Sequence, residues 1–296
     1  MGHLRSGSRR FGYEMTIFHF RNVRPPGSNA QNHGPGVTLY RTDLAITDQR
    51  SHTFHQKISY YFPQSGHASS TSLNVRAGTA GLSGSSPVSM SLGFSMPSGS
   101  AHLHLSSLRP AMDVGGRGLI RFSTGFTYYY SLTDLATSGR LVVGGRSYRV
   151  VGTSWLDHQW GNWSWATSGG WTWMALQLRN HTQLSVFDVR GPSGHTRAAS
   201  ILLRGGQLLT LHEVSFQPLG TWTSPHTGAH YPSGFLVTIP GVNARLRVMP
   251  TVKDQELWLA SQPRGSYWEG SATVTGTWKG HPVTGLAYTE LTGYAK

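Results

Sequence analysis

The sequence contains no cysteine among its 296 residues, so disulfides, thiolate metal sites and a cysteine nucleophile are excluded. Charged residues make up only 12% of the chain, well below the roughly 25% that is typical of soluble domains. No apolar run approaches the roughly 20 residues that a membrane-spanning helix needs. The chain also lacks G-x-S-x-G, G-x-x-x-x-G-K-[ST] and G-x-G-x-x-G segments. A nucleophile elbow and phosphate-binding loops are therefore not supported.

The charge balance is strongly basic, but the basic residues are dispersed. There are 25 Lys and Arg residues against 12 Asp and Glu residues, which gives a formal net charge of +13. Nearly all of the cations are arginines, and no run is longer than the Arg9-Arg10 pair. Because nucleic-acid arms usually show a dense basic block, we expect no nucleic-acid partner. Attraction to anionic ligands, or association with an anionic membrane surface, fits this charge better.

The first residues give no sign of a secretory signal, because MGHLRSGSRRFGYE has no apolar core segment. A strand-like pattern already begins at residue 11, so we expect that the chain lacks its true beginning. The compartment stays open, since a chain without disulfides can lie on either side of a membrane, and an extracytoplasmic location fits as well.

Alternation of apolar and polar residues predicts β-strands along nearly the whole chain, with no helical periodicity of useful length. Gly144-Gly145 predicts a two-residue hairpin, and residues 179–182 predict a second hairpin. Residues 24–36 predict a loop, and residues 64–100 predict either an irregular excursion or a set of short strands. The expected strands are residues 11–21, 51–63, 102–108, 119–132, 139–156, 171–178, 183–190, 199–216, 234–240, 245–250 and 266–291.

Two acidic residues stand out from these patterns. Asp188 continues an apolar stripe with Leu184 and Val186 on one strand face, so it either pairs with an arginine such as Arg190 or Arg121 or is a proton-donating carboxyl in an apolar cavity. Asp157 lies in WLDHQWGNWSW (155–165), which holds four of the ten tryptophans. In extended backbone Asp157 and His158 point to opposite faces, so Asp157 is expected to bond outward to backbone donors or an arginine. This segment is either a hydrogen-bond knot or a dry site at which a proton moves.

Histidines give no convincing metal site. None of the close pairs has a third ligand at a persuasive spacing, so we predict no metal and no cofactor. The pairs are His52 with His55, His102 with His104, and His226 with His230.

Several segments in a fixed order resemble the signatures of one family. They are GTSWLDHQWG (152–161), WTSPHTGAHYPSGFLVTIPG (222–241), DQEL (254–257), YWEG (267–270) and GLAYTELTGY (285–294). The family contains the carotenoid 1,2-hydratases (hydroxyneurosporene synthases) and the AttH-type proteins, and its fold is related to the lipocalins. The resemblance runs from about residue 2 to the end, but the Trp- and Tyr-rich strand that usually precedes GHLRSGSRRFGYEMTIFHFR is missing.

The resemblance implies an all-β fold of two lipocalin-like antiparallel barrels or sandwiches packed together, residues 1–164 and residues 165–296. Such a barrel encloses a cavity that suits one elongated apolar ligand, such as a carotenoid, another isoprenoid or a lipid. Hydration of an unactivated double bond needs a strong acid in a dry site and aromatic faces that stabilise a carbocation.

The resemblance also assigns roles. It implies Asp188 as the proton donor, His158 as the residue that positions it or shares its proton, and Trp160 as a wall of the cation site. Ligand contacts are expected from Trp155, Trp173 and Tyr288, and structural roles from Asp157 and Glu290. Many family members carry Glu where this chain has Gln159, and an amide cannot act as an acid or base there. Two alternatives remain: a non-catalytic carrier of apolar ligands linked to an ABC transport system, and a secreted hydrolase, which the missing nucleophile motif disfavours.

Overall fold

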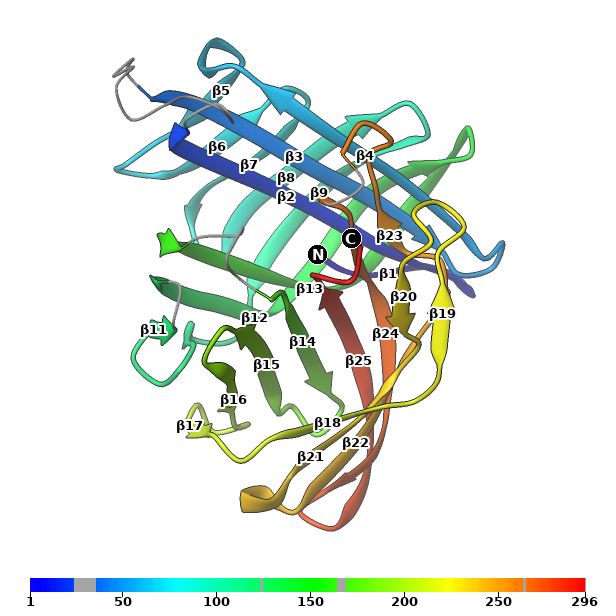
Figure 1. Cartoon of the computed structure of the whole chain (residues 1–296). Coiled ribbons are helices and arrows are strands. Elements are labelled where there is room, and N and C mark those ends of the chain that lie inside the picture. The colour runs from blue at the N-terminus through cyan, green and yellow to red at the C-terminus, as the bar shows by residue number, and fades with distance from the viewer. Residues whose placement is uncertain (24–35, 123–124, 164–168, 263–264, 296) are drawn as a thin grey trace.

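A computed structural model describes residues 1–23, 36–122, 125–163, 169–262 and 265–295 of the chain. These residues form two large antiparallel sheets that pack against each other, so the predicted all-β fold is confirmed (Figure 1). Only two single-turn 3-10 helices occur in the described part, η1 (Pro63–Ser65) and η2 (Pro240–Val242). Within these residues no helix is long and apolar enough to cross a bilayer.

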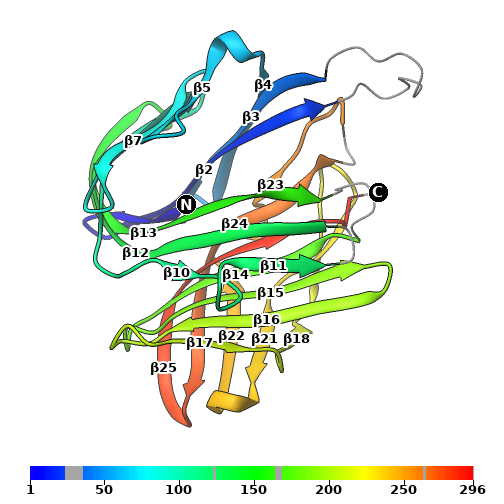
Figure 2. The same cartoon turned by 90° about the vertical axis from the view of Figure 1, so that its left-hand side faces the viewer.

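The first sheet contains thirteen strands and curls into a half-barrel (Figure 2). Its main path runs β4-β3-β2-β1-β13-β12-β9-β8-β7-β6-β5, with β10 and β11 paired to β12. The strands are β1 (Gly2–Ser6), β2 (Arg9–Val23), β3 (Val37–Asp48), β4 (Thr53–Tyr61), β5 (Gly66–Ala68), β6 (Leu73–Ala77), β7 (Ala80–Ser86), β8 (Ser89–Met96), β9 (Gly99–Ser107), β10 (Met112–Asp113), β11 (Leu119–Phe122), β12 (Gly125–Val143) and β13 (Arg146–Trp163).

The second sheet contains ten strands in the order β17-β16-β15-β14-β25-β24-β22-β21-β18, with β23 paired to β24, and β19 and β20 form a separate hairpin. The strands are β14 (Trp171–Leu178), β15 (Gln183–Gly191), β16 (Gly194–Leu202), β17 (Leu208–Leu211), β18 (Ser215–Pro218), β19 (Thr221–Thr223), β20 (His230–Pro232), β21 (Phe235–Ile239), β22 (Ala244–Pro250), β23 (Glu256–Leu257), β24 (Tyr267–Trp278) and β25 (His281–Leu291).

Each sheet buries one face in its own core, and at some of its strands the other face is turned toward the neighbouring sheet. On β3, Leu44 and Ile46 pack inside the half-barrel, so the residues between and beside them point to the opposite face. On β24, Ala272 and Val274 pack inside the second half in the same way. Two apolar clusters pack the interiors of the two halves, and the ligand-sized barrel cavity that the resemblance implies stays a prediction.

A third apolar cluster joins the two sheets. The Trp155 and Trp173 rings meet edge to face at 6.3 Å between centroids, one from each sheet. The Thr47 hydroxyl donates a 2.8 Å hydrogen bond to the Gln255 side chain across the same boundary. We call this layer, where β2, β3 and β13 face β14, β24 and β25, the junction.

Most local predictions are confirmed, but one long strand and several short ones were missed. Gly144 and Gly145 both have positive φ, 57° and 74°, and join β12 to β13 as the predicted hairpin. Residues 64–100 form short strands rather than an irregular excursion. The longest missed strand is β3, and the shorter strands β1, β10, β19, β20 and β23 were missed as well. Most of the loop predicted at 24–36 lies outside the described residues. The division at residue 164 into separate domains stays a prediction, although the first sheet ends with β13 and the second begins with β14.

Candidate functional site

Three glutamates form a row across the junction. Glu269 on β24 and Glu290 on β25 are directly opposite each other in the antiparallel register, which brings their side chains close together on one face. Glu14 on β2 reaches across from the first sheet and shares a hydrogen bond with Glu269. Glu14 and Glu269 are buried, whereas Glu290 is half-buried. We call these three residues the glutamate row.

No cation neutralises the glutamate row by a direct ion pair among the described residues, so its members keep protons. Burial, followed by the charge of Asp43, raises the pKa of Glu14 to about 8. Burial likewise raises the pKa of Glu290 to about 7, and it raises the pKa of Glu269 strongly, helped by the charges of Glu14 and Glu290. If Glu14 and Glu269 were both ionised, each could only accept hydrogen bonds, and neither could donate one to the other. Glu14 Oε2 has no other hydrogen-bond donor within the described ranges, so the proton of a carboxylic acid must fill that place. A proton held between Glu14 and Glu269 satisfies both groups.

One carboxyl beside the row is neutralised differently. Asp43 on β3 accepts hydrogen bonds from Arg41 Nε at 2.8 Å and from the Tyr267 hydroxyl at 2.7 Å. The same hydroxyl lies 3.4 Å from Glu14 Oε1, so Tyr267 links the Asp43–Arg41 pair to the glutamate row. The junction thus places one ion pair next to a set of protonated carboxyls.

Tryptophans provide both the walls of the site and hydrogen bonds to it. Asp157 accepts bonds from Trp155 Nε1 at 2.7 Å and from the Ser131 hydroxyl at 2.6 Å. The expectation that it bonds to backbone donors or an arginine is therefore wrong, because an indole and a hydroxyl from neighbouring positions satisfy it. Burial raises the pKa of Asp157. The Trp171 indole hydrogen-bonds to Glu290 and partly offsets the effect of burial on that carboxyl.

Two of the three expected ligand-contacting residues line a small cavity at the junction. The cavity has a volume of about 10 Å³ and is lined by Met1, Gly2, His3, Trp155, Ala175, Gln177 and Tyr288. This volume holds about one water molecule. Trp173, the third expected residue, packs against Trp155, and its own Nε1 donates to the Ser185 hydroxyl at 3.1 Å. The Tyr288 hydroxyl is buried without a hydrogen-bond partner.

His158 and Trp160 lie on the other face of β13. His158 Nδ1 is 3.1 Å from the Tyr130 hydroxyl, and its ring is 4.8 Å from the Trp160 ring. Partial burial lowers the pKa of His158. Trp160 is 48% exposed and stacks on Tyr128, which is 42% exposed, so these side chains form an aromatic patch on the surface. Their predicted catalytic roles stay predictions.

Asp188 does not occupy an apolar cavity. It lies opposite Arg197 on β16, forms an ion pair with Arg197 Nε at 3.1 Å and hydrogen-bonds to His195 Nδ1 at 2.8 Å. The interpretation as an unpaired carboxyl is therefore wrong, and the alternative of an arginine partner is right, although Arg197 supplies it instead of Arg190 or Arg121. The hydrogen bonds of the described residues do not connect Asp188 with His158, which bonds to Tyr130.

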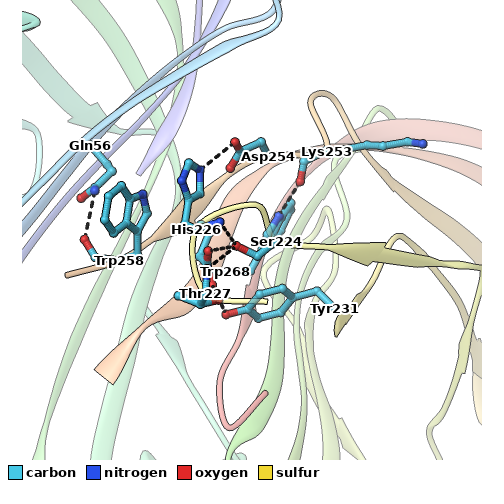
Figure 3. A network of polar contacts seen from close by, with 10 residues as sticks. Gln56, Ser224, His226, Thr227, Tyr231, Lys253, Asp254, Trp258 and Trp268 are labelled. Atoms are coloured by element: carbon cyan, nitrogen blue, oxygen red, sulfur yellow. Dashed lines mark hydrogen bonds and ion pairs between the residues drawn. The ribbon is translucent and has the colours of Figure 1, made fainter. Parts of the chain in front are cut away.

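The long motif at residues 222–241 forms a structural knot with the DQEL segment (Figure 3). Buried Glu256 accepts hydrogen bonds from the hydroxyls of Ser224, Thr227 and Tyr231. Ser224 Oγ also accepts from the backbone amides of residues 226 and 227, and His226 bonds to Asp254. Ser224 therefore donates to a carboxylate rather than to a histidine, which disfavours a serine hydrolase.

Metal coordination finds no support either. Within the described residues, no group of three or more His, Asp or Glu side chains could hold a metal ion. His226 bonds to Asp254, and His230 Nδ1 is 2.9 Å from the Thr223 hydroxyl, so each has an ordinary polar partner.

The protein is an all-β protein of two packed antiparallel halves. The junction between the halves is rich in carboxyl groups and tryptophans. A family model, AttH-like, matches residues 1–294, and the chain belongs to that family. The AttH protein of Nitrosomonas europaea superposes with a TM-score of 0.84 at 24% identity, over 99% of this chain and 90% of that one. Kievitone hydratase of Nectria haematococca superposes with a TM-score of 0.79 at 21% identity, over 98% and 87%. Both likenesses concern the fold, and a comparison with curated protein sequences gives no match.

Sequence reasoning singled out only part of this site. The sequence predicted a structural role for Glu290. It predicted no role for Glu14, which lies in FGYE, or for Tyr267 and Glu269, which lie in YWEG. The sequence could have indicated these three residues, because in each case a polar side chain interrupts the apolar pattern of a strand. Asp43 was missed together with β3, although VTLYRTDLAITD is rich in β-branched residues.

Proposed function

We propose that this protein hydrates a carbon–carbon double bond of an apolar, isoprenoid-type compound at the junction. The glutamate row carries the proposal, because it places carboxylic acids that stay protonated near neutral pH beside tryptophan rings. A general acid works best when its pKa lies near the working pH, and a pKa of about 7 at Glu290 meets that condition.

Glu290 is the member of the row that would meet the substrate. It is half-buried, whereas Glu14 and Glu269 are buried behind it. Its carboxyl proton adds to the less substituted carbon of the double bond, and the positive charge develops on the more substituted carbon. Water then adds to that carbon and returns one proton to the Glu290 carboxylate, so the net reaction is the addition of one water. The neighbouring Glu269, directly opposite, can pass a proton to Glu290 from the interior of the row.

The walls of the site favour an apolar substrate. Trp155, Trp171 and Trp173 belong to the apolar cluster at the junction, and aromatic faces stabilise a cation without reacting with it. The name of the kievitone hydratase neighbour also states a hydration reaction, which supports the reaction type. The junction cavity holds about one water molecule, so the substrate would have to reach Glu290 from the side on which that residue is half-exposed.

The test compares two variants, in each of which an amide of nearly the same size replaces a carboxyl group. Glu290→Gln keeps the shape and removes the proton, so turnover of a prenyl-chain alkene should fall by at least about 100-fold. Asp188→Asn, the control, removes a carboxyl that is already paired with Arg197 and His195, so turnover should stay within about threefold of the parent. Product is measured by mass spectrometry as incorporation of labelled water. Full activity in Glu290→Gln contradicts the assignment, and its loss in Asp188→Asn alone restores Asp188 as the acid.

A second candidate is a carrier of apolar ligands without turnover, and the exposed aromatic patch of Tyr128 and Trp160 favours it. A carrier would bind a long-chain fluorescent probe and release it unchanged. In that case Trp160→Ala would weaken binding, while Glu290→Gln would leave binding unchanged and no product would form with any variant.

A further inference from the structure

The surface of this protein is far more cationic than its sequence suggests. Of the twelve acidic residues only Asp113 and Glu213 are exposed, because the others are buried or half-buried in the glutamate row, the ion pairs and the Glu256 knot. Most arginines, in contrast, are exposed. The net charge of +13 therefore lies on the outside, with few carboxylates to balance it.

The cations gather on the outward face of the first sheet. The strand register aligns one line of residues across seven neighbouring strands, from β13 to β5, and these strands are labelled in Figure 1. In order, the line is Arg149, Arg140, His102, Gly93, Gly81, Arg76 and His67. At about 4.8 Å per strand it extends roughly 30 Å along the sheet.

Two more arginines extend this face at its β13 end. Arg5 and Arg10 are opposite each other on β1 and β2, and Arg5 is opposite Val151, two residues from Arg149. The five arginines 5, 10, 76, 140 and 149 are exposed, and none takes part in an ion pair of the described residues. We call these five, with His67, His102 and His104, the arginine face.

Negative charge and bulk are both absent from this face. Between Asp48 and Asp113 the sequence has no acidic residue, and this stretch supplies β4 to β9. The neighbouring line of residues on the same face contains His104 and three small residues, Ser138, Ser91 and Ser83. The result is a broad, cation-lined sheet surface.

Exposed apolar side chains border the same face. Val151, 43% exposed, lies between Arg5 and Arg149, and Val88 and Leu108, 59% and 62% exposed, lie where β8 begins and β9 ends. Arginines that surround exposed aliphatic residues match the chemistry of a bilayer surface, with anionic headgroups outside and acyl chains within reach. A nucleic-acid surface would call for aromatic stacking or a shape that enters a groove, and this face offers neither.

We infer that the arginine face docks this protein on a membrane surface rich in anionic lipid. The inference is independent of the hydration reaction, because the arginine face and the glutamate row share no residue. It also gives the basic charge a use other than nucleic-acid binding.

The test is cosedimentation with vesicles at near-physiological salt. The parent protein should bind vesicles of phosphatidylcholine and phosphatidylglycerol in equal amounts and should not bind pure phosphatidylcholine. Arg5→Gln/Arg140→Gln/Arg149→Gln should weaken binding by at least about tenfold, since each basic residue near an anionic surface contributes severalfold. The matched control, Arg245→Gln/Arg247→Gln/Lys279→Gln, removes the same charge from exposed positions of the second half and should change binding by less than about threefold.

Three results would overturn the inference. The first is a parent protein that does not bind the anionic vesicles. The second is an equal loss of binding in both triple variants, which would show that net charge and not the arginine face is responsible. The third is tighter binding to a short DNA duplex than to the vesicles at the same salt concentration. All six positions are exposed, so circular dichroism of both variants should match that of the parent.

Discussion

Buried carboxyls occur in this protein in two kinds of surroundings. Asp188 pairs with Arg197 and His195, and Glu256 receives three hydroxyl hydrogen bonds. Glu14 and Glu269 have no cation partner among the described residues and share a hydrogen bond. The hydroxyls of Thr16 and Tyr267 lie 3.2 and 3.4 Å from Glu14 Oε1, which leaves Oε2 for the proton shared with Glu269. Burial is similar in both settings, so the difference between them lies in the hydrogen-bond and ion-pair partners.

The difference separates structural acids from acids that can react. A carboxylate that arginine or several hydroxyl donors hold is stable as an anion and fixes neighbouring strands. A carboxyl without such donors stays neutral until the pH approaches its raised pKa, and it can donate a proton near neutral pH. The glutamate row is therefore the part of the molecule where proton chemistry is expected, and the Glu256 knot is the part where stability is expected.

The largest effect should come from the knot. Glu256→Ala leaves the hydroxyls of Ser224 and Tyr231 buried without their acceptor, so we expect the free energy of unfolding to fall by about 3–5 kcal/mol. Glu269→Gln, at an equally buried position, should change it by less than about 1 kcal/mol near neutral pH, because a neutral carboxylic acid is replaced by a neutral amide. Urea denaturation of both variants measures this, and equal losses would show that the two settings do not differ.

The pH dependence of stability should follow the glutamate row. Unfolded glutamates lose their protons near about pH 4.3, whereas folded Glu290 and Glu14 keep theirs up to about 7 and about 8. Between these values the folded state binds more protons, so the free energy of unfolding decreases as the pH rises, by up to about 1.4 kcal/mol per pH unit for each retained proton.

Glu14→Gln should flatten that dependence between about pH 5 and 8, as followed by urea denaturation at a series of pH values. Asp48 makes a contribution to the pH dependence of stability that has the opposite sign. Burial alone would raise the pKa of Asp48, but the hydrogen bonds from Arg9 and neighbouring groups lower it. Its contribution is present above the unfolded pKa and is lost as the pH falls. A stability that increases steadily from pH 5 to 8 would contradict the protonated row.

A moderate effect is expected from the indole that binds Asp157. Trp155→Phe keeps most of the aromatic packing but removes the 2.7 Å bond to the carboxyl, which should lower the free energy of unfolding by about 1–2 kcal/mol. Trp160→Phe, on the exposed face of the same strand, should lower the free energy of unfolding by less than about 0.5 kcal/mol. Thermal unfolding of the two variants side by side tests whether the junction face of β13 is the face that matters for stability.

The smallest effect should be at Gln159. This residue is exposed, and the family resemblance leads us to expect Glu at the same position in many members. Gln159→Ala should change both stability and turnover very little, with a free-energy change within about 0.5 kcal/mol. A large loss of turnover would place the working site at the exposed end of β13 and away from the glutamate row.

The sequence pattern was sufficient for the fold but not for the site. Alternation at residues 171–178 places Trp173 and Met174 on opposite faces, and the structure confirms it, because Met174 lies in the core and Trp173 at the junction. The same alternation marks Asp188 as unusual. It cannot reveal that Arg197 lies opposite on the next strand, since that depends on the β15–β16 register.

The glutamate row shows the same limit across sheets. Glu269 and Glu290 are 21 residues apart in one hairpin, so their pairing depends on the register alone. Glu14 belongs to the other sheet, and its bond to Glu269 depends on how the two halves pack. No local pattern encodes that packing, and a carboxyl can be recognised as unpaired only when all of its neighbours are known.

Infrared spectroscopy of the carboxyl groups tests the protonated row most directly. At about pH 6, below the raised pKa values of Glu14 and Glu290, the folded protein should show the carbonyl band of protonated carboxylic acids. The band should weaken in Glu14→Gln and in Glu290→Gln and should be unchanged in Asp188→Asn. The absence of the band at this pH, or its loss only in Asp188→Asn, would contradict a proton-holding glutamate row at the junction.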